Sequence, residues 1–345
     1  MEDGDLVPLQ LPLGDAVKRA RTAAQARATR PTMEAPRDVP DHETPPGDDE
    51  GSPLALTPEV LGGEPVEVGY AARLFAQLSL PYRDPGNDLA EWVRRNGSLE
   101  LVVHPGRTID PKTGKTTRAY PYGVLPRLLV TWMATEAVAT KDRILVLGGS
   151  LSSFLHALGL RPTGGTKGDI GRLRDQMNRT LLSTMVVTDQ RPTSDRGGAF
   201  TFADDYQLWW SDRHPSEEPL WRSTITLSER FFDSIVSAPV PVDLGALRRL
   251  RGSALRLDIY TWLTYRMSYL HKPTIVPWDA LNHQFGGAYA EARKFKRDFL
   301  RQLAAVRMVY SEAKVEPTDS GLVLRPSPSH VPGRRLKRGR PGAGR

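Results

Sequence analysis

The fold is decided by residues 144–187, ILVLGGSLSSFLHALGLRPTGGTKGDIGRLRDQMNRTLLSTMVV. The apolar run at 144–147 is too short for a helix and two glycines follow it, so we expect a strand there. Ser150 is suited to cap the next helix, whose apolar side chains share one face. Gly159 can end that helix in the left-handed conformation that glycine adopts without strain.

A second helix is expected after a turn at residues 161–165, whose proline and glycines exclude a helix. Thr166 and Asp169 have the spacing of a capping box at its start. Apolar side chains then recur at helical spacing and predict one buried face, formed by Ile170, Leu173, Met177 and Leu181. Polar and charged side chains fall on the opposite face: Arg172, Asp175, Gln176 and Arg179.

The residues after this helix predict a hairpin, with strands at 185–187 and 197–202. Helix, turn, helix and hairpin is the order of a winged-helix domain, which places its second helix in the major groove of DNA. A helical domain with a solvated basic face is the alternative interpretation of the same residues.

More elements are expected before this stretch. Order is predicted to begin near Gly69, with a helix over residues 70–78 and a β-hairpin over residues 99–121 whose turn lies at 112–115. A helix that leads from residue 123 to about residue 140 then serves as the first helix of the winged domain.

The second half of the chain repeats this plan. Helices are expected at 244–250, 253–270, 278–285 and 289–307, and strands at 274–276, 308–310, 313–316 and 322–324. Four pairs of residues, each 122 positions apart, match buried with buried or basic with basic side chains: Leu181 and Leu303, Met177 and Phe299, Arg179 and Arg301, and Arg172 and Lys294. Two helices that each have one apolar and one basic face favour two DNA-reading helices.

Charge is distributed unevenly along the chain. The whole sequence carries a net charge of +7, but residues 1–63 hold twelve acidic and six basic side chains, a net of −6. The remainder therefore carries +13, which favours a polyanionic partner such as nucleic acid; solubility alone is the alternative. The absence of cysteine excludes a disulfide framework, a cysteine-ligated zinc site and a thiol nucleophile, and it fits a cytoplasmic protein.

These patterns predict an α+β fold, mainly α, with two tandem winged-helix domains and disordered tails. The expected segments are a disordered, acidic and proline-rich region at 1–68, a first winged-helix domain with an N-terminal helix and hairpin at 69–226, a second at 227–330, and a basic tail at 331–345. Within this tail, Arg338-Gly339-Arg340-Pro341 resembles the core of an AT-hook, which inserts both arginines into a narrow A·T minor groove. A non-specific phosphate-binding tail is the alternative.

The candidate DNA-binding side chains are basic or amide groups on the two second helices, the turn before the first of them, and the tail. They are Lys167, Arg172, Arg174, Gln176, Asn178, Arg179, Arg293, Lys294, Lys296, Arg297, Arg301, Arg338 and Arg340. Phosphate contacts are expected from Lys167, Arg174 and Lys296. Arginines on the outward faces suit guanine, and Gln176 or Asn178 suits adenine.

The chain also resembles plasmid RepA-type replication initiators, from about Leu80 to Pro332. The matching stretches are Pro121-Tyr122-Gly123 with Pro126-Arg127, Thr135-Glu136-Ala137, Leu147-Gly148 with Ser150 and Phe154, Leu158-Gly159-Leu160 with Pro162-Thr163-Gly164-Gly165, Arg172-Leu173-Arg174-Asp175-Gln176-Met177, residues 257–266 (LDIYTWLTYR) and Gln284-Phe285-Gly286. The resemblance implies a protein that binds repeated sites in double-stranded plasmid origin DNA, helps open adjacent A·T-rich duplex and recruits a host replication initiator or helicase. It leaves monomer and homodimer open.

Two other classes remain as alternatives. A transcriptional regulator that represses its own promoter fits the same DNA-binding pattern. A nicking enzyme needs two histidines separated by one apolar residue, and the seven histidines here are isolated: His42, His104, His156, His214, His271, His283 and His330. A helicase needs a phosphate-binding loop, and Ile109 stands where the first glycine of such a loop would precede Gly114-Lys115-Thr116. We therefore expect no catalytic residue, metal or cofactor. No apolar run approaches the roughly 20 residues of a membrane span, so no membrane contact is expected.

Overall fold

A computed structural model of the chain describes residues 66–109, 114–148, 150–161, 163, 168–209, 223–287 and 291–331. The chain divides into two units, Met1–Pro65 and Val66–Arg345, and all of the described residues belong to the second. The expected disordered N-terminal region therefore falls almost wholly outside the described residues, and the AT-hook-like tail from residue 332 does so entirely.

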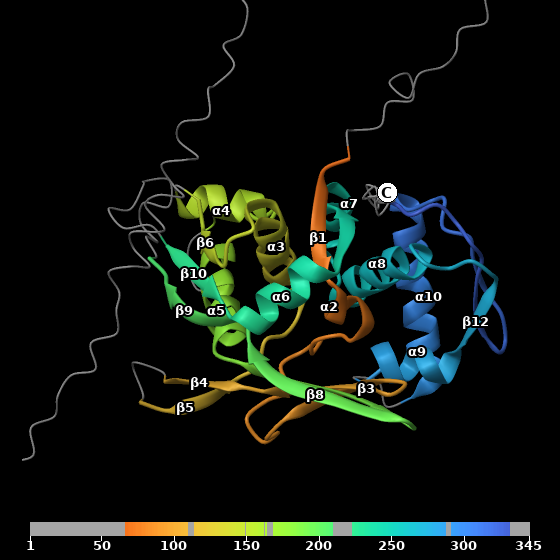
Figure 1. Cartoon of the computed structure of the whole chain (residues 1–345), viewed down its shortest axis with the longest axis horizontal. Helices are drawn as coiled ribbons and strands as arrows, with labels where there is room; N and C mark the ends of the chain where they lie inside the picture. Colours follow the sequence, from red (N-terminus) through yellow and green to blue (C-terminus); the bar gives the residue numbers. More distant parts are fainter. Residues whose placement is uncertain are drawn as a thin grey trace, which may run out of the picture. The chain divides into compact units, whose positions relative to one another are not determined.

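The first half contains a helix–strand–helix–helix unit, then the hairpin expected at residues 185–187 and 197–202, which belongs to another sheet, and then two more strands (Figure 1). Its elements are α3 (Val124–Thr140), β6 (Ile144–Val146), α4 (Leu151–Ala157), α5 (Asp169–Leu181), β9 (Ala203–Gln207) and β10 (Thr224–Leu227). The three strands form an antiparallel sheet of order β6-β10-β9, so the strand before the helix pair lies beside the last strand.

Among the described residues, the second half has the same order of elements except that no hairpin comes between its second helix and its last two strands. Its unit consists of α8 (Ala254–Met267), β12 (Thr274–Pro277), α9 (Trp278–Phe285), α10 (Ala292–Val309), β13 (Val315–Pro317) and β14 (Gly321–Leu324). The sheet order is β12-β14-β13, again with the strand before the helix pair beside the last strand. The internal repeat inferred from the 122-residue spacing is therefore present in the topology.

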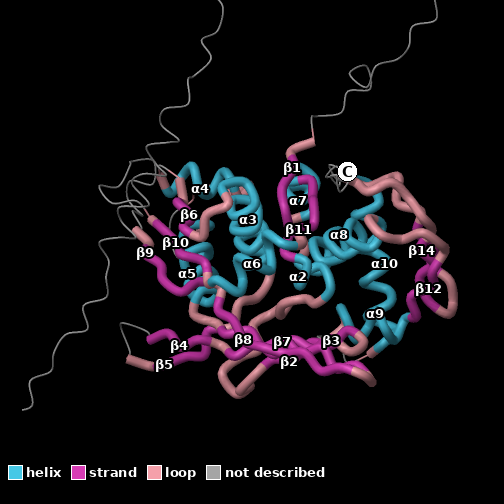
Figure 2. The backbone as a smooth tube through the Cα atoms, viewed as in Figure 1, coloured by secondary structure: helices cyan, strands magenta, loops and turns pink. Residues whose placement is uncertain are grey.

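A four-stranded antiparallel sheet of order β2-β3-β7-β8 runs along the lower side of the view, from beneath α5 to α9 (Figures 1 and 2). Its strands are β2 (Trp92–Asn96), β3 (Leu99–His104), β7 (Thr184–Arg191) and β8 (Ser194–Thr201). Strand β7 begins three residues after α5 ends, and β2 packs against α9. The sheet therefore contacts both halves.

The remaining elements link the halves or flank them. They are β1 (Val68–Ala72), α2 (Arg73–Gln77), β4 (Gly106–Ile109), β5 (Thr116–Ala119), α6 (Glu229–Ser237), β11 (Pro239–Asp243) and α7 (Leu244–Leu250). Strand β1, which precedes the first unit, pairs with β11, which precedes the second. The expected domain boundary between residues 226 and 227 stays a prediction.

Local signals account for several of these elements. The side chain of Ser253 accepts a hydrogen bond from the Arg256 N–H and so caps α8, and Asp243 caps α7 through the Gly245 N–H at 2.8 Å. Gly159 has a φ of +70° after α4, as its predicted role as a left-handed terminator requires. The apolar face predicted for α5 is confirmed, since Ile170, Leu173, Met177 and Leu181 are all buried.

Other expectations need correction. Residues 308–310 are the end and C-cap of α10, because the periodic apolar face of that helix continues to Val306 and Val309. Residues 70–72 are extended because they pair with β11, so the helix there begins only at Arg73. Strand β3 pairs with β2 and β7, and the hairpin is instead β4–β5.

Two further points concern fold class and capping. The described residues form nine helices and fourteen strands, so the fold is mixed α and β, and a mainly-α fold is not confirmed. The N-cap of α5 is Gly168, without a side-chain cap. The expected capping residue, Thr166, lies outside the described residues, and the hydroxyl of Thr163 accepts the Asp169 N–H at 3.0 Å.

Candidate nucleic-acid interface

The outward face of α10 is basic. Its exposed side chains in the first turns include Arg293, Lys294, Arg297 and Arg301. The side chains of Arg297 and Arg301 are 72% and 70% exposed, so their guanidinium groups reach solvent. The helix is held by its opposite face, which is buried through Phe295, Phe299, Leu303 and Val306.

The charge of α10 is only weakly balanced. The helix carries six basic residues and one acidic residue, Asp298. The Asp298 carboxylate lies 3.7 Å from Arg297 and 3.3 Å from Arg301, so one carboxylate orients two guanidinium groups and leaves a net positive face. Such a face attracts phosphate and can present guanidinium forks to base edges.

Lys296 lies on the flank of this face. Its Nζ is 4.7 Å from the centroid of the Trp278 ring, at the start of α9. This cation–π contact fixes the ammonium group beside the neighbouring helix while leaving it a positive charge for a phosphate. The sequence analysis did not single out Trp278, since its partner lies 18 residues away and no local spacing signals the contact.

The outward face of α5 is more nearly neutral. The helix carries three basic and two acidic residues. Arg172 and Arg174 are exposed, and Arg172 forms an ion pair with Asp169 at 3.5 Å. Asn178 is partly exposed one turn after Arg174, so these two side chains share the outward side. The described outward face of α5 is therefore less basic than that of α10, and its role as a second reading helix stays a prediction.

The position of Arg179 requires a correction. Its side chain is only 15% exposed, and its Nε lies 2.9 and 2.8 Å from the two carboxylate oxygens of Asp175. Its Nη1 lies 3.2 Å from Asp84, and its guanidinium carbon is 5.3 Å from the Tyr122 ring. This cluster turns Arg179 toward the protein. At the equivalent position in α10, the side chain of Arg301 is 70% exposed and pairs only weakly with Asp298, at 3.3 Å.

Gln176 also does not face outward. It is 5% exposed, and its Oε1 accepts a hydrogen bond of 3.0 Å from the backbone N–H of Tyr122. The Gln176 side chain therefore satisfies a backbone N–H just before α3 and is not available to bind adenine. Gln176 lies next to buried positions of α5, and a neutral amide there can be either buried or exposed. The spacing of the apolar residues alone does not distinguish the two cases.

The other candidates fall into three groups. Arg293, Lys294 and Arg297 gather on α10, and Arg172, Arg174 and Asn178 lie on α5. Lys167, Arg338 and Arg340 lie outside the described residues. The other 122-residue pairs agree in burial, since Leu181 and Leu303 are both buried while Arg172 and Lys294 are both exposed.

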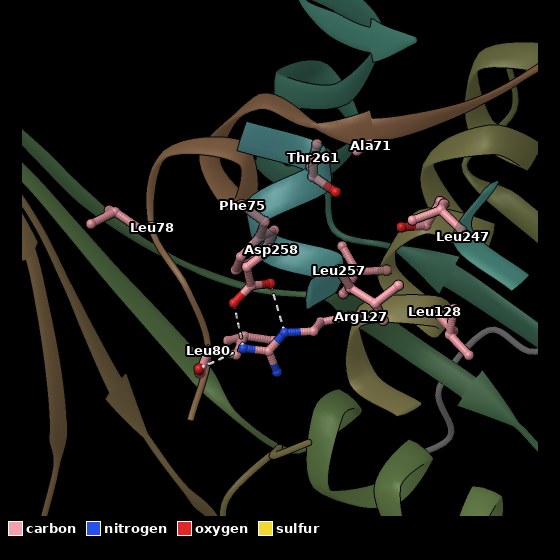
Figure 3. Close-up of a pocket in the computed structure, with 13 residues that line it drawn as sticks. Ala71, Phe75, Leu78, Leu80, Arg127, Leu128, Leu247, Leu257, Asp258 and Thr261 are labelled. Carbon is pink, nitrogen blue, oxygen red and sulfur yellow. Dashed lines mark hydrogen bonds and ion pairs between the residues drawn. The ribbon is translucent and has the colours of Figure 1, made fainter. Parts of the chain in front are cut away.

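Figure 3 shows a small interior cavity of about 30 Å³ beside α3 and α8, lined mainly by apolar side chains. At its wall the guanidinium of Arg127 is hydrogen-bonded to the carboxylate of Asp258 and to the Leu80 carbonyl oxygen. A space of this size holds one or two water molecules and no substrate.

Over the described ranges, no three His, Cys, Asp or Glu side chains are grouped as a metal site would require. None of the helices in the described part of the chain is long and apolar enough to cross a membrane.

Comparison with known proteins bears on this geometry. A family model described as "Plasmid encoded RepA protein" matches residues 120–280, from the approach to α3 into α9. This match supports a RepA-type replication initiator family. The resemblance to RepA-type replication initiators inferred from the sequence is thereby confirmed, and it covers the first helix–strand–helix–helix unit together with α8 and β12.

One solved structure to which the chain is similar contains domains 2 and 3 of RctB. The similarity has a TM-score of 0.47 and 14% sequence identity, and it covers 76% of this chain and all of the RctB chain. No curated protein sequence matches the chain. The RepA family match ends at residue 280, within α9. It therefore does not cover the basic face of α10.

Proposed function

We propose that this protein initiates plasmid replication by binding repeated sites in double-stranded origin DNA through two winged-helix modules. The observation that carries the proposal is the exposed basic face of α10, on the second helix of a helix pair that is followed by a two-stranded hairpin. The RepA match over residues 120–280 supplies the replication context.

The winged-helix assignment rests on topology. In each half a helix and a short strand precede two helices, and that short strand lies beside the last strand of a three-stranded sheet. In the first half the β7–β8 hairpin, which belongs to the four-stranded sheet, comes between α5 and β9. This arrangement places α5 and α10 as the second helices, which enter the major groove in helix-turn-helix proteins. The hairpins β9–β10 and β13–β14 then stand as the wings beside each groove contact.

The modules contribute unequally. On α10, Arg297 and Arg301 project two guanidinium forks that suit guanine, while Arg293 and Lys294 lie where the sugar-phosphate backbone would pass. On α5, Arg174 supplies a phosphate contact and Asn178 an adenine contact. We therefore assign most of the affinity to the second module and expect the first to add selectivity.

The proposal extends from DNA binding to replication. Binding at repeated sites bends and strains the intervening duplex, and such deformation favours opening of flexible A·T-rich sequence. Opening, recruitment of a host initiator or helicase, dimer formation, residence in the cytoplasm and the absence of a catalytic activity are parts of this proposal. A plain autorepressor is the rival, and it is distinguished by its failure to support replication of an origin plasmid.

The test uses fluorescence anisotropy with fragments from the DNA that flanks the coding region. The double variant Arg297→Ala, Arg301→Ala is expected to lose specific binding by at least about 1–3 kcal/mol for each lost base contact while keeping its thermal transition. Arg95→Gln is the matched control, because Arg95 is exposed on β2 and pairs with Glu100. Normal specific binding by the double variant would contradict the assignment of α10 as the reader.

A further inference from the structure

The buried arginine of β2 forms no ion pair with a carboxylate of the described residues. Arg94 is 4% exposed, and among the described residues no acidic side chain forms an ion pair with it. Its Nε is buried without a hydrogen-bond partner. Burial lowers the pKa of its guanidinium, which is the expected cost of desolvating a charge. Burying the charged guanidinium of Arg94 is costly, so we expect this side chain to have a specific structural role.

Aromatic rings and a helix end surround the guanidinium of Arg94. Its central carbon lies 4.6 Å from the centroid of the Trp92 ring and 6.0 Å from that of Tyr82. A Cβ placed on Gly287 would come within 2.2 Å of its Nη1, so the group lies directly against this backbone. Gly287 follows the C-cap of α9, where the helix dipole favours a cation.

A second contact ties the same strand to the same helix. The carbonyl oxygen of Gln77 accepts the side-chain amide of Asn96, on β2, at 2.9 Å and that of Gln284, on α9, at 2.8 Å. The hydroxyl of Ser79 in turn donates to the Gln284 carbonyl at 3.1 Å. Strand β2 is therefore fixed to α9 at two points, of which Arg94 is the one nearer to the start of α10.

The other side of β2 leads to α5. Arg94 pairs in register with Leu101 on β3, which pairs with Val187 on β7. Strand β7 follows α5 after two residues. A continuous hydrogen-bonded sheet thus runs from the end of one proposed reading helix to a contact on the turn that precedes the other (Figures 1 and 2).

We infer that Arg94 is a positioning residue: through Gly287 it fixes the orientation of α10 relative to α5, and so the spacing at which the two modules contact DNA. The inference rests on the proposed function for its consequence at DNA, but its structural content does not depend on DNA. The guanidinium is long enough to reach the helix end, and glycine at 287 leaves it room.

The chain's lack of cysteine permits a direct test without DNA. Spin labels are placed at Arg172→Cys and Lys294→Cys, which are exposed and equivalent positions on α5 and α10. Pulsed dipolar spectroscopy then measures the distance distribution between them. The parent should give one narrow distribution, and Arg94→Gln should give one about twofold wider or displaced, because a packed contact that selects one arrangement is lost.

Two further variants make the test decisive. Arg95→Gln lies on the same strand with its side chain 71% exposed, and it should leave the distribution unchanged. Gly287→Ala displaces the guanidinium from the opposite side at an exposed position, so it reports the same contact if Arg94→Gln fails to fold. An unchanged distribution in both Gly287→Ala and a folded Arg94→Gln would overturn the inference.

A DNA measurement separates this inference from the proposed function. In the parent, inserting about half a helical turn, roughly 5 base pairs, between the two groove contacts should weaken binding by at least about tenfold. In Gly287→Ala the same insertion should cost clearly less. If the parent binds no DNA specifically, the proposed function fails while the distance measurement still decides the positioning role. If the parent shows the spacing penalty and the variant keeps it in full, the positioning role is wrong.

Discussion

The guanidinium of Arg127 and the carboxylate of Asp258 form a buried, doubly hydrogen-bonded ion pair between α3 and α8, with N···O distances of 2.7 and 2.8 Å. Both side chains are 8% exposed. The remaining donors of Arg127 are satisfied by the carbonyl oxygens of Leu80, Pro81 and Gly123. This pair therefore joins the first helices of the two repeated units and also fixes the chain between α2 and β2 and the start of α3.

Removing one partner of this pair should be severe. Arg127→Met leaves the Asp258 carboxylate buried without a counter-charge, and we expect a loss of about 3–5 kcal/mol in the free energy of unfolding. The double variant Arg127→Met, Asp258→Leu should recover only part of that loss, because it removes the unpaired carboxylate but leaves the Leu80, Pro81 and Gly123 carbonyl oxygens without their donor. Urea denaturation measures both. In the exposed pair of Arg325 and Glu316, Arg325→Met should cost under about 1 kcal/mol.

Arg179 and Arg301 occupy equivalent positions but should respond differently to alanine. Arg179→Ala breaks charged hydrogen bonds to Asp175 and Asp84, and a loss of about 1.5–3 kcal/mol in stability is expected. Arg301→Ala removes an exposed side chain and should change stability by less than about 0.5 kcal/mol while weakening DNA binding. Thermal and chemical denaturation of the two variants side by side decides this. Equal losses of stability in the two variants would contradict the difference in burial between Arg179 and Arg301.

Two neighbours on α5 should separate phosphate contact from base contact. Arg174→Ala should reduce the slope of log K against log salt by about 0.9, one phosphate contact, with little change in base preference. Asn178→Ala should leave that slope unchanged and relax selectivity at one adenine by about 1–3 kcal/mol. Titrations at several salt concentrations on matched and single-substituted sites give both quantities. The reverse pattern would exchange the two roles.

Stability should depend on pH through His330. Its Nδ1 shares a hydrogen bond of 2.7 Å with the Tyr260 hydroxyl, and its ring stacks on Tyr310 with centroids 4.7 Å apart. Burial, opposed by the nearby charge of Asp243, lowers the pKa of His330 below its ordinary value. Below about pH 6.5 the unfolded chain then binds more protons than the folded one, so stability falls as the pH falls.

The check is urea denaturation across the range from pH 7.5 downward, in the parent and in His330→Asn. In His330→Asn the free energy of unfolding should decrease less steeply toward acid pH than it does in the parent. His283→Asn, at an exposed position of α9, is the control and should keep the parent's slope. A parent-like decline in His330→Asn would assign the effect to other groups.

The sequence predicted those features that rest on local periodicity. The bounds of Leu244–Leu250 and Trp278–Phe285 agree with the expected helices, and the apolar face of α5 is placed correctly. Each of these elements has a helical apolar repeat with a glycine or proline within a few residues of one end. Such signals require no knowledge of which distant segment covers them.

What could not be predicted depends on long-range contacts. Residues 70–72 read as helical, yet pairing with β11 across some 170 positions makes them a strand. The sequence pattern places Arg179 on the outward face of its helix. In the structure its guanidinium instead contacts Asp84 and the Tyr122 ring. The same holds for Arg94, whose role follows from the position of Gly287. Amphipathic spacing identifies a polar face, but tertiary packing decides which part of it meets solvent.

The most direct test of the account is footprinting of the DNA flanking the coding region, with competitor DNA at about 150 mM salt, where surface charge alone is screened. The account predicts regularly spaced protected repeats, all lost together in Arg297→Ala, Arg301→Ala and retained in Arg95→Gln. Uniform, salt-sensitive coating without discrete footprints would contradict it and leave a general nucleic-acid binder.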